Sequence, residues 1–249
     1  MKRSDLVGWL DSHLLGSHSR DSAINGLQVE GDEEVGHLVI AVDACQYTID
    51  KAAELGAQMM FVHHGLFWGR ESALVGSHGK RVRALNSAGI NLYAAHLPLD
   101  SHPSMGNNSE LARLLGLNDV RPFGAYSGEP IGVSGCIEPV SRDDLADKIS
   151  SLLEHRVQVL PLGPRVIQRV SIVSGGGSQS LGESIAGGFD LLITGEAPHY
   201  SYFEAEEGAV NMFLAGHYAT ETLGVKAFGR AIAEKFGIKV TFIDHPTGL

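Results

Sequence analysis

Two apolar segments of this chain end in the same pattern, a histidine followed four residues later by a carboxylate. The pairs are His96 with Asp100 and His217 with Glu221, the second with one glycine inserted before the histidine. Imidazole and carboxylate groups are the ligands that hold zinc, iron, manganese and nickel in proteins. The spacing of His217 and Glu221 also suits two side chains on one turn of a starting helix. The repeated pattern therefore predicts a metal site to which both halves of the chain contribute.

An adjacent pair of histidines, His63 and His64, follows a third apolar segment, residues 59–62. Successive residues of a strand point to opposite faces, so two neighbouring histidines do not readily bind one ion. Gly65 lets the backbone turn where the strand ends, and two metals, each bound by one histidine, would also remove the difficulty. A single histidine is more often an ordinary polar residue than a ligand. It is the combination of histidines and carboxylates at the ends of three apolar segments that favours a metal. We expect no such role for the remaining histidines away from these segments, which are His13, His18, His37, His78, His102, His155 and His245.

Two residues are expected to assist chemistry rather than to bind the metal themselves. His96 is predicted to orient a ligand or to transfer a proton. Glu196 follows Thr194 and Gly195 at the repeat position of residues 63–65, which predicts a base facing the same cleft. Residues 175–177, three glycines, are a weaker candidate. They suit a phosphate cradle at a helix N-terminus, but a tight strand-to-helix turn is favoured because no nucleotide-binding fingerprint surrounds them.

The elements that must position these residues alternate between strands and helices. Apolar runs and helical periodicity predict a strand–helix–strand–helix–strand order with boundaries at 37–43, 46–55, 59–62, 80–88 and 90–95. The same order returns later, with expected elements at 169–174, 178–186 and 189–194. Asp43 lies 20 positions before His63, and Ser174 lies 20 positions before Thr194, so the repeat matches in spacing as well as in order. This predicts an α/β fold with parallel or mixed sheets covered by helices.

The repeat also predicts the organisation of the chain. Residues 1–119 are expected to form a first α/β repeat and residues 165–249 a second, with a non-repeated insert at 120–164 that is positioned to be a lid or an oligomer contact. In open α/β sheets, ligands bind beyond the carboxyl ends of the strands. We therefore expect the metal cleft between the two halves, where their strand ends face each other.

Composition limits the partners. The chain has 249 residues, 19 of them basic and 29 acidic, so its formal charge is −10, which argues against nucleic acid as the main partner. Only Cys45 and Cys136 are available for a disulfide, and we expect both to be reduced thiols. The amino terminus lacks the apolar core of a signal peptide, and no apolar run approaches the roughly 20 residues needed to cross a bilayer. A cytoplasmic protein that does not associate with membranes is expected.

At these residues the chain resembles the GTP cyclohydrolase 1 type 2 homologue family, also called the NGG1-interacting-factor-3-like family. The resemblance covers essentially the whole chain. It rests on the segments 25–31, 62–65, 96–100, 106–108, 194–196 and 216–221. The resemblance implies two intertwined α/β repeats, a dinuclear metal centre and a toroidal homohexamer. It also implies a ligand set in which Glu221 bridges the two metals; this set is His63, His64, Asp100, His217 and Glu221.

Two classes of function follow from these expectations. The first is a metal-dependent hydrolase that acts on a nucleotide-like or other small cyclic substrate, because two divalent metals can activate a water and polarise the bond to be broken. Glu196 or His96 would then assist proton transfer. The second is a non-catalytic metal-binding, storage or sensing scaffold that forms a ring. The nitrogen and oxygen ligands suit zinc, iron, manganese and nickel almost equally, so the residues do not select the metal.

Overall fold

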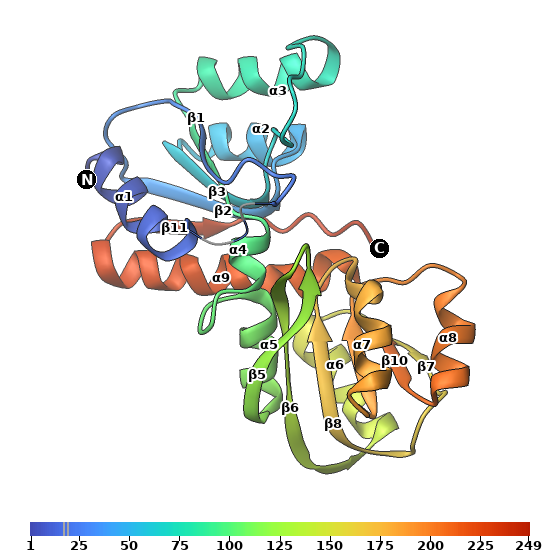
Figure 1. The fold of residues 1–249 in the computed structure, drawn as a ribbon. Coiled ribbons are helices and arrows are strands. Elements are labelled where there is room, and N and C mark those ends of the chain that lie inside the picture. Colours follow the sequence, from blue (N-terminus) through green and yellow to red (C-terminus); the bar gives the residue numbers. More distant parts are fainter. Residues whose placement is uncertain (17, 19) are drawn as a thin grey trace. The chain divides into compact units, whose positions relative to one another are not determined.

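The computed structural model describes residues 1–16, 18 and 20–249 of the chain, and it contains two compact units that are each built from two segments (Figure 1). Unit 1 consists of Met1–His102 and Gly224–His245, and unit 2 consists of Pro103–Leu223 and Pro246–Leu249. Each unit holds one sheet with helices packed on it. The predicted α/β class with mixed sheets is therefore confirmed.

Unit 1 contains a five-stranded mixed sheet. In spatial order its strands are β1 (Gly26–Val29), β4 (Asn91–Ala94), β3 (Met59–His64), β2 (His37–Asp43) and β11 (Lys239–Phe242). All neighbouring strands are parallel except β1, which is antiparallel to β4. The helices of this unit are α1 (Arg3–Leu14), α2 (Gln46–Glu54), α3 (Gly76–Ser87), α4 (Leu97–Asp100) and the later part of α9 (His217–Phe236).

Apolar side chains cover both faces of this sheet. One face packs on α2 and α3 through a buried cluster that includes Ile49 and Leu85. On the other face, the ring of Phe228 from α9 lies 5.5 Å from that of Phe61 on β3 and 6.0 Å from that of Trp9 on α1. Parallel strands that are buried on both faces read as continuous apolar runs, which is why residues 37–43 and 59–62 were recognisable in the sequence.

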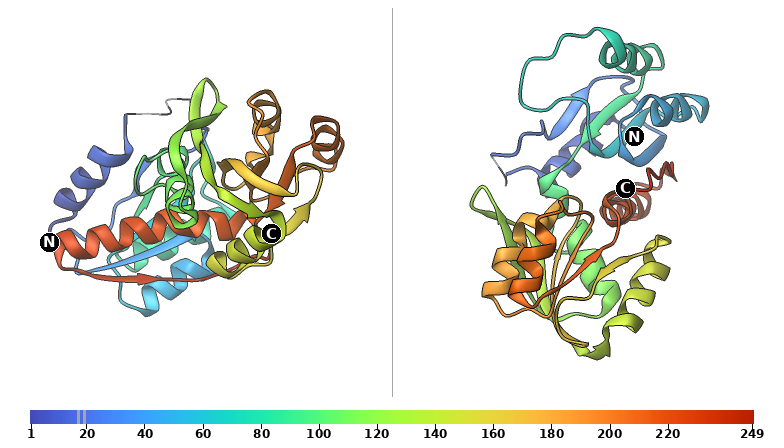
Figure 2. Two further views of the ribbon diagram at one scale, coloured as in Figure 1. Left: turned by 90° about the horizontal axis from the view of Figure 1, so that it is seen from below. Right: turned by 90° about the vertical axis from the view of Figure 1, so that its right-hand side faces the viewer.

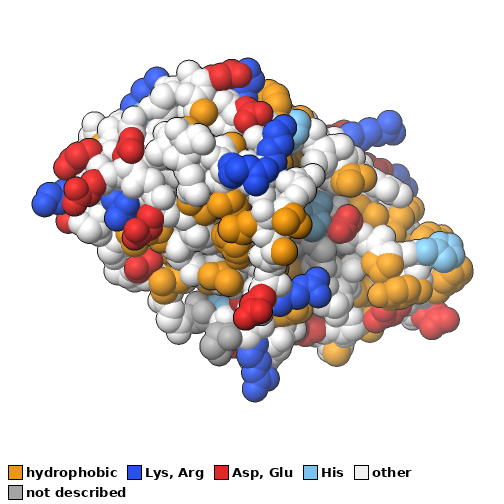
Figure 3. Space-filling view, turned by 90° about the horizontal axis from the view of Figure 1, so that it is seen from above, with side chains coloured by type: hydrophobic (Ala, Val, Ile, Leu, Met, Phe, Trp, Pro, Cys, Tyr) orange, Lys and Arg blue, Asp and Glu red, His pale blue; other side chains and the backbone are white. Residues whose placement is uncertain are grey.

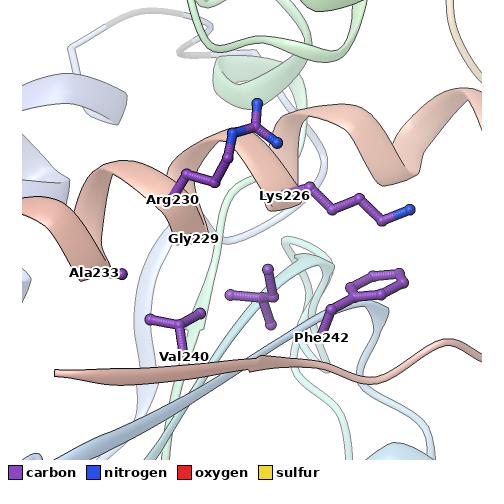
Figure 4. Close-up of a pocket in the computed structure, with 7 residues that line it drawn as sticks. Lys226, Gly229, Arg230, Ala233, Val240 and Phe242 are labelled. Atoms are coloured by element: carbon purple, nitrogen blue, oxygen red, sulfur yellow. The ribbon is translucent and has the colours of Figure 1, made fainter.

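The last strand of unit 1, β11, returns beside α9 (Figure 2). A cavity of about 340 Å³ lies between the two elements (Figure 4). Lys226 extends from α9 over β11, with its ammonium nitrogen 4.4 Å from the centre of the Phe242 ring. A Cβ on Gly229 would lie 2.5 Å from Cδ1 of Ile40. The missing side chain therefore lets α9 approach the sheet closely at this point.

Unit 2 contains a six-stranded mixed sheet. In spatial order its strands are β5 (Asn118–Tyr126), β6 (Glu129–Ser141), β8 (Val166–Val173), β9 (Leu191–Thr194), β10 (Asn211–Leu214) and β7 (Gln158–Leu160). The strands β8, β9 and β10 are parallel, and the other pairs are antiparallel. The helices are α5 (Asn107–Leu115), α6 (Arg142–Leu153), the 3₁₀ helix η1 (Gly177–Ser180), α7 (Leu181–Ala186), α8 (Ser201–Gly208) and residues 217–223 of α9.

Both sheets contain the same motif of three adjacent parallel strands joined by two helices. It runs from β2 to β4 in unit 1 and from β8 to β10 in unit 2. Asn91 and Asn211 open the third strand of each copy, and both are fully buried. The side chain of Asn91 bonds to the backbone of Gly31, Asp32 and Gln58. The side chain of Asn211 bonds in the same way to the backbone of residues 163, 164 and 190. In both copies, a buried asparagine thus connects the start of the third strand to neighbouring backbone segments.

The compact units differ from the expected division at 119 and 164. The expected insert, 120–164, supplies β5, β6, α6 and β7, which belong to the sheet of unit 2 and to its cover. The segment 224–245 belongs to unit 1 because β11 pairs with β2. Backbone pairing between distant segments, which periodicity does not reveal, explains this difference. Within the described residues, no helix combines the length and apolar character needed to cross a membrane.

Candidate metal centre

His63 and His64 end β3, at the carboxyl edge of the parallel strands of unit 1. His63 is fully buried, and its Nδ1 lies 2.9 Å from the carbonyl oxygen of Ala95. A carbonyl oxygen only accepts hydrogen bonds, so Nδ1 carries the hydrogen and Nε2 of the neutral ring presents a lone pair. Histidine ligands of metals are held in this way, because the bond at one nitrogen fixes the tautomer and orients the other.

His64 and His96 show the same arrangement with carboxylates. Nδ1 of His64 lies 2.9 Å from Oδ1 of Asp43, and Nδ1 of His96 lies 2.9 Å from Oδ1 of Asp21. The three imidazoles of His63, His64 and His96 offer ligand atoms that all lie within 4.8 Å of one another. Unit 1 thus brings together three ring nitrogens that are suited to a metal. His96 was expected only to orient or to transfer protons, but its geometry matches that of His64.

Asp21 is held as a carboxylate by its surroundings. Burial alone would raise its pKa, but the hydrogen bond and charge of His96, with bonds from Asn25 and the Ala23 amide, outweigh burial and lower the pKa to about 2. Sequence reasoning missed both Asp21 and Asp43 as partners of the histidines. Asp43 had a recognisable signal, because it ends β2 beside β3 and its register partner is His64. Asp21 lies in a loop with no periodic pattern.

Asp100 reaches the same cluster from the short helix α4. His96 precedes the first residue of α4, and Pro98 lies in its first turn, a position that proline favours. The turn places the buried Asp100 so that its Oδ2 lies 3.6 Å from Nε2 of His63. The predicted grouping of His63, His64 and Asp100 in one half of the protein is therefore seen within unit 1.

Unit 2 brings together His217, Glu221 and Glu196. His217 and Glu221 occupy the first turn of α9, as their spacing predicts, with Nε2 of His217 3.1 Å from Oε1 of Glu221. Nδ1 of His217 lies 3.0 Å from Oε1 of Glu196, so this imidazole too is oriented by a carboxylate. Glu221 is buried, whereas Glu196 is exposed. Glu196 therefore has a contact that suits a residue orienting His217.

Gly175 and Gly176 lie in a tight turn after β8 and Gly177 opens η1, which agrees with the strand-to-helix turn favoured over a phosphate cradle. The carbonyl oxygen of Gly175 accepts bonds from the amides of Gly195 and Glu196, which fixes the loop that carries Glu196. A Cβ added to Gly175 would lie 2.2 Å from Oε1 of Glu221 and 3.1 Å from Nε2 of His217. The glycine therefore makes room for the donor atoms, a role that its sequence pattern did not reveal.

The donor sets of the two units fit a divalent metal. Each of the four histidines uses Nδ1 to bond a carbonyl or carboxylate oxygen, and each unit adds a buried carboxylate, Asp100 or Glu221. Nitrogen and oxygen donors with such outer partners suit zinc, iron, manganese and nickel. No thiol takes part, since neither Cys45 nor Cys136 belongs to these clusters.

Metal uptake by His217 is expected to release a proton even at pH 8. The hydrogen bond to Glu221 raises the pKa of His217 to about 9, burial opposes this, and Glu196 adds to the rise. A raised pKa means that the metal-free ring stays protonated up to about pH 9, so affinity at this histidine should rise with pH until then. Calorimetric titration at pH 8 in two buffers of different ionisation heat measures the released proton. His217→Ala should release fewer protons, and equal release from both proteins would contradict the assignment.

The charged ring also affects the metal-free fold. Its pairing with Glu221 and Glu196 stabilises the folded state fully below the unfolded pKa of about 6.5, and this contribution is lost as pH rises through about 9. The metal-free protein should therefore lose a contribution to its stability between pH 6.5 and 9, and His217→Ala should lose less over that range.

Comparison with known proteins gives matches over the whole chain. The sequence profile of Duf34/NIF3 (NGG1p interacting factor 3) matches residues 1–248. A GTP cyclohydrolase 1 type 2 homolog of Pyrococcus abyssi is 47% identical over 100% of both chains, and one of Deinococcus radiodurans is 43% identical over 99% of this chain and 94% of its own. The crystal structure of TTHA1606 from Thermus thermophilus has a TM-score of 0.93 and 40% identity, with 100% of both chains covered.

Proposed function

We propose that this chain, which belongs to the Duf34/NIF3 family, binds two divalent metal ions and uses them in a hydrolytic reaction. The observation that carries the proposal is that His63, His64 and His217 each have Nδ1 within 2.9–3.0 Å of a carbonyl or carboxylate oxygen. Histidine ligands of metals almost always have such an outer partner, which orients the imidazole.

The proposal assigns the ligands to both units. They are His63, His64 and Asp100 from unit 1 and His217 and Glu221 from unit 2, with Glu221 shared by the two ions. Five protein ligands for two ions would leave coordination positions for water and substrate, which a closed structural site lacks. Bound divalent ions would supply an activated water and a Lewis acid for a carbonyl, imine or phosphoryl oxygen.

The remaining polar groups of the chain would orient ligands and move protons. Asp43 and Asp21 fix the rings of His64 and His96, and Glu196 fixes His217. In the proposed reaction Glu196 or His96 transfers a proton to or from the substrate, since both lie beside ligand residues. A nucleotide-like or other small cyclic substrate is proposed. The name of the relatives, GTP cyclohydrolase 1 type 2 homolog, supports a ring-opening hydrolysis as the class to test first.

A second candidate is a non-catalytic scaffold that stores, delivers or senses metal. The burial of His63, Asp100 and Glu221 supports this candidate because buried ligands retain a metal tightly. The two candidates differ in what metal removal does. A chain of this length buries a full core without a metal, so a catalytic centre should be removable without unfolding.

Metal reconstitution distinguishes the two candidates. Protein purified without a metal-affinity tag would be analysed for its elements, stripped by a chelator, and reloaded with zinc, iron(II), manganese or nickel. A hydrolase should retain its circular dichroism after stripping and should regain hydrolysis of a cyclic substrate, GTP among those screened, only with metal. Unfolding on chelation at pH 7.5, with no turnover in any reloaded form, would favour the scaffold.

We also propose that the protein assembles as a ring-shaped homohexamer, as the family resemblance implies. The chain has a mass of 26.5 kDa, so six copies give 6 × 26.5 = 159 kDa. Light scattering coupled to size-exclusion chromatography at micromolar concentration should give this mass. A mass near that of one chain would refute the assembly.

A further inference from the structure

Unit 2 contains a cavity of about 380 Å³ beside the loop that carries Glu196. This volume lies within the range of small-molecule sites, about 300–1,000 Å³. Its lining combines the edge strand β7, the end of β10, the loop after β9 and the start of α8. The lining residues are Gln158, Leu160, Ala197, Pro198, His199, Tyr202, Phe203 and Leu214.

The pocket is aromatic and open to solvent. Tyr202 is 38% exposed and Phe203 is 50% exposed, and their rings lie 5.6 Å apart, edge to face. The ring of His199 lies 5.5 Å from that of Phe203 in a second edge-to-face contact. In the space-filling view, hydrophobic side chains surround a histidine at the right-hand edge, the side on which α8 lies in Figure 1 (Figure 3). Exposed rings gathered around a hollow are typical of a binding site.

The side chains that line the pocket include no lysine and no arginine to pair with a phosphate group. Residues 170–225 contain no lysine and no arginine. In the sequence, Glu196 directly precedes the lining residue Ala197, and Glu204 directly follows the lining residue Phe203. An anion would meet repulsion here, whereas a neutral planar ring would gain stacking on aromatic faces.

The pocket and the donor set of unit 2 share two segments of the chain. Ala197, in its wall, directly follows Glu196, and Leu214 lies three residues before His217. Since Oε1 of Glu196 bonds to His217, the same loop lines the pocket and orients a proposed ligand. A molecule in the pocket would therefore contact the loop that carries Glu196.

We propose that this pocket binds the uncharged, planar heteroaromatic ring of the substrate, with the ring packed against Tyr202 and Phe203. The proposal rests on the proposed function, since it names the class of substrate for that centre. It places the ring of a nucleoside-like molecule in the pocket and any anionic group elsewhere.

Binding of adenosine to the metal-free protein tests the pocket separately from the metal. Adenosine should bind in an isothermal or NMR titration, and Phe203→Ala should weaken it roughly tenfold, the usual effect of removing one stacking partner. Phe203→Tyr, which keeps a ring, should restore most of the affinity. Adenosine 5′-monophosphate should bind less tightly than adenosine, because no lysine or arginine lines the pocket to compensate the phosphate charge, and ribose should not compete.

Tyr200→Ala is the matched control, because Tyr200 is 69% exposed beside the same helix start but does not line the pocket. It should leave adenosine binding unchanged. No adenosine binding to the wild type at millimolar concentration, or equal loss from Tyr200→Ala and Phe203→Ala, would overturn the proposal. The proposal would also be overturned if Phe203→Ala changed the molar mass of the assembly and the wild type did not bind adenosine. The aromatic surface would then be a contact between copies of the chain. Metal content, measured on the same variants, should stay unchanged, so a failure of the pocket and a failure of the metal proposal are distinguishable.

Discussion

Glu221→Gln is expected to lower the occupancy of both metals, whereas His63→Ala and His64→Ala should each lower mainly one. An amide oxygen carries no charge and is a poor bridging ligand, while each imidazole is proposed to serve a single ion. Removing even an outer partner of a ligand typically costs about 10-fold to 100-fold in metal affinity, so loss of the bridge should exceed about 10-fold at both ions. Metal content after dialysis against a weak chelator, measured by elemental analysis, gives the comparison.

The control for these variants is His245→Ala. His245 is an exposed histidine that stacks on Tyr47 in unit 1, outside the donor sets. It should retain wild-type metal content. Unchanged metal content in Glu221→Gln, His63→Ala and His64→Ala together would rule out the dinuclear assignment.

Gly175→Ala should impair metal binding although it removes no ligand. The added Cβ would lie 2.2 Å from Oε1 of Glu221, so the carboxylate would have to move out of its position beside His217. The backbone of Gly175 also has a φ of +57°, which costs an alanine on the order of 1–2 kcal/mol. We expect at least a tenfold loss of metal affinity together with a moderate loss of stability, measured by metal titration and thermal unfolding.

Two alanine variants separate these effects. Gly176→Ala changes the next residue of the same turn, where φ is −79° and the nearest atom to the new Cβ is 3.8 Å away. Gly116→Ala has a φ of +79° and nothing within 4 Å, so it carries the backbone strain without the clash. Gly116→Ala should lose stability but keep its metal affinity, and Gly176→Ala should keep both. If Gly116→Ala lost as much metal as Gly175→Ala, displacement of Glu221 would not be the cause.

Local pattern determined much of the fold of this protein. The runs before His63 and His96 were recognisable as strands because parallel strands buried on both faces are continuously apolar. The N-terminal cap of α6 is also local, since the Ser141 hydroxyl accepts a bond from the Asp144 amide and serine is a favoured capping residue. The spacing of His217 and Glu221 placed both on one helical turn, because residues four apart share a helix face. These features depend on neighbours in the chain, which the sequence shows directly.

Only the tertiary structure decided which groups orient the ligands. Asp21 and Asp43 lie 75 and 21 positions from the histidines that they hold, and the partner of His63 is a backbone carbonyl that no residue type encodes. The space that Gly175 leaves for Glu221, 46 positions away, was equally hidden in the sequence.

Contacts between distant segments also decide how the chain divides into unit 1 and unit 2. The pairing of β11 with β2 joins residues about 200 positions apart and moves the end of the chain into unit 1. The sequence determined the ligand types and the strands that carry them, because both follow from local composition and period. The tautomers, the outer carboxylates and the unit boundaries depend on contacts between distant segments, and only folding in three dimensions brings those segments together.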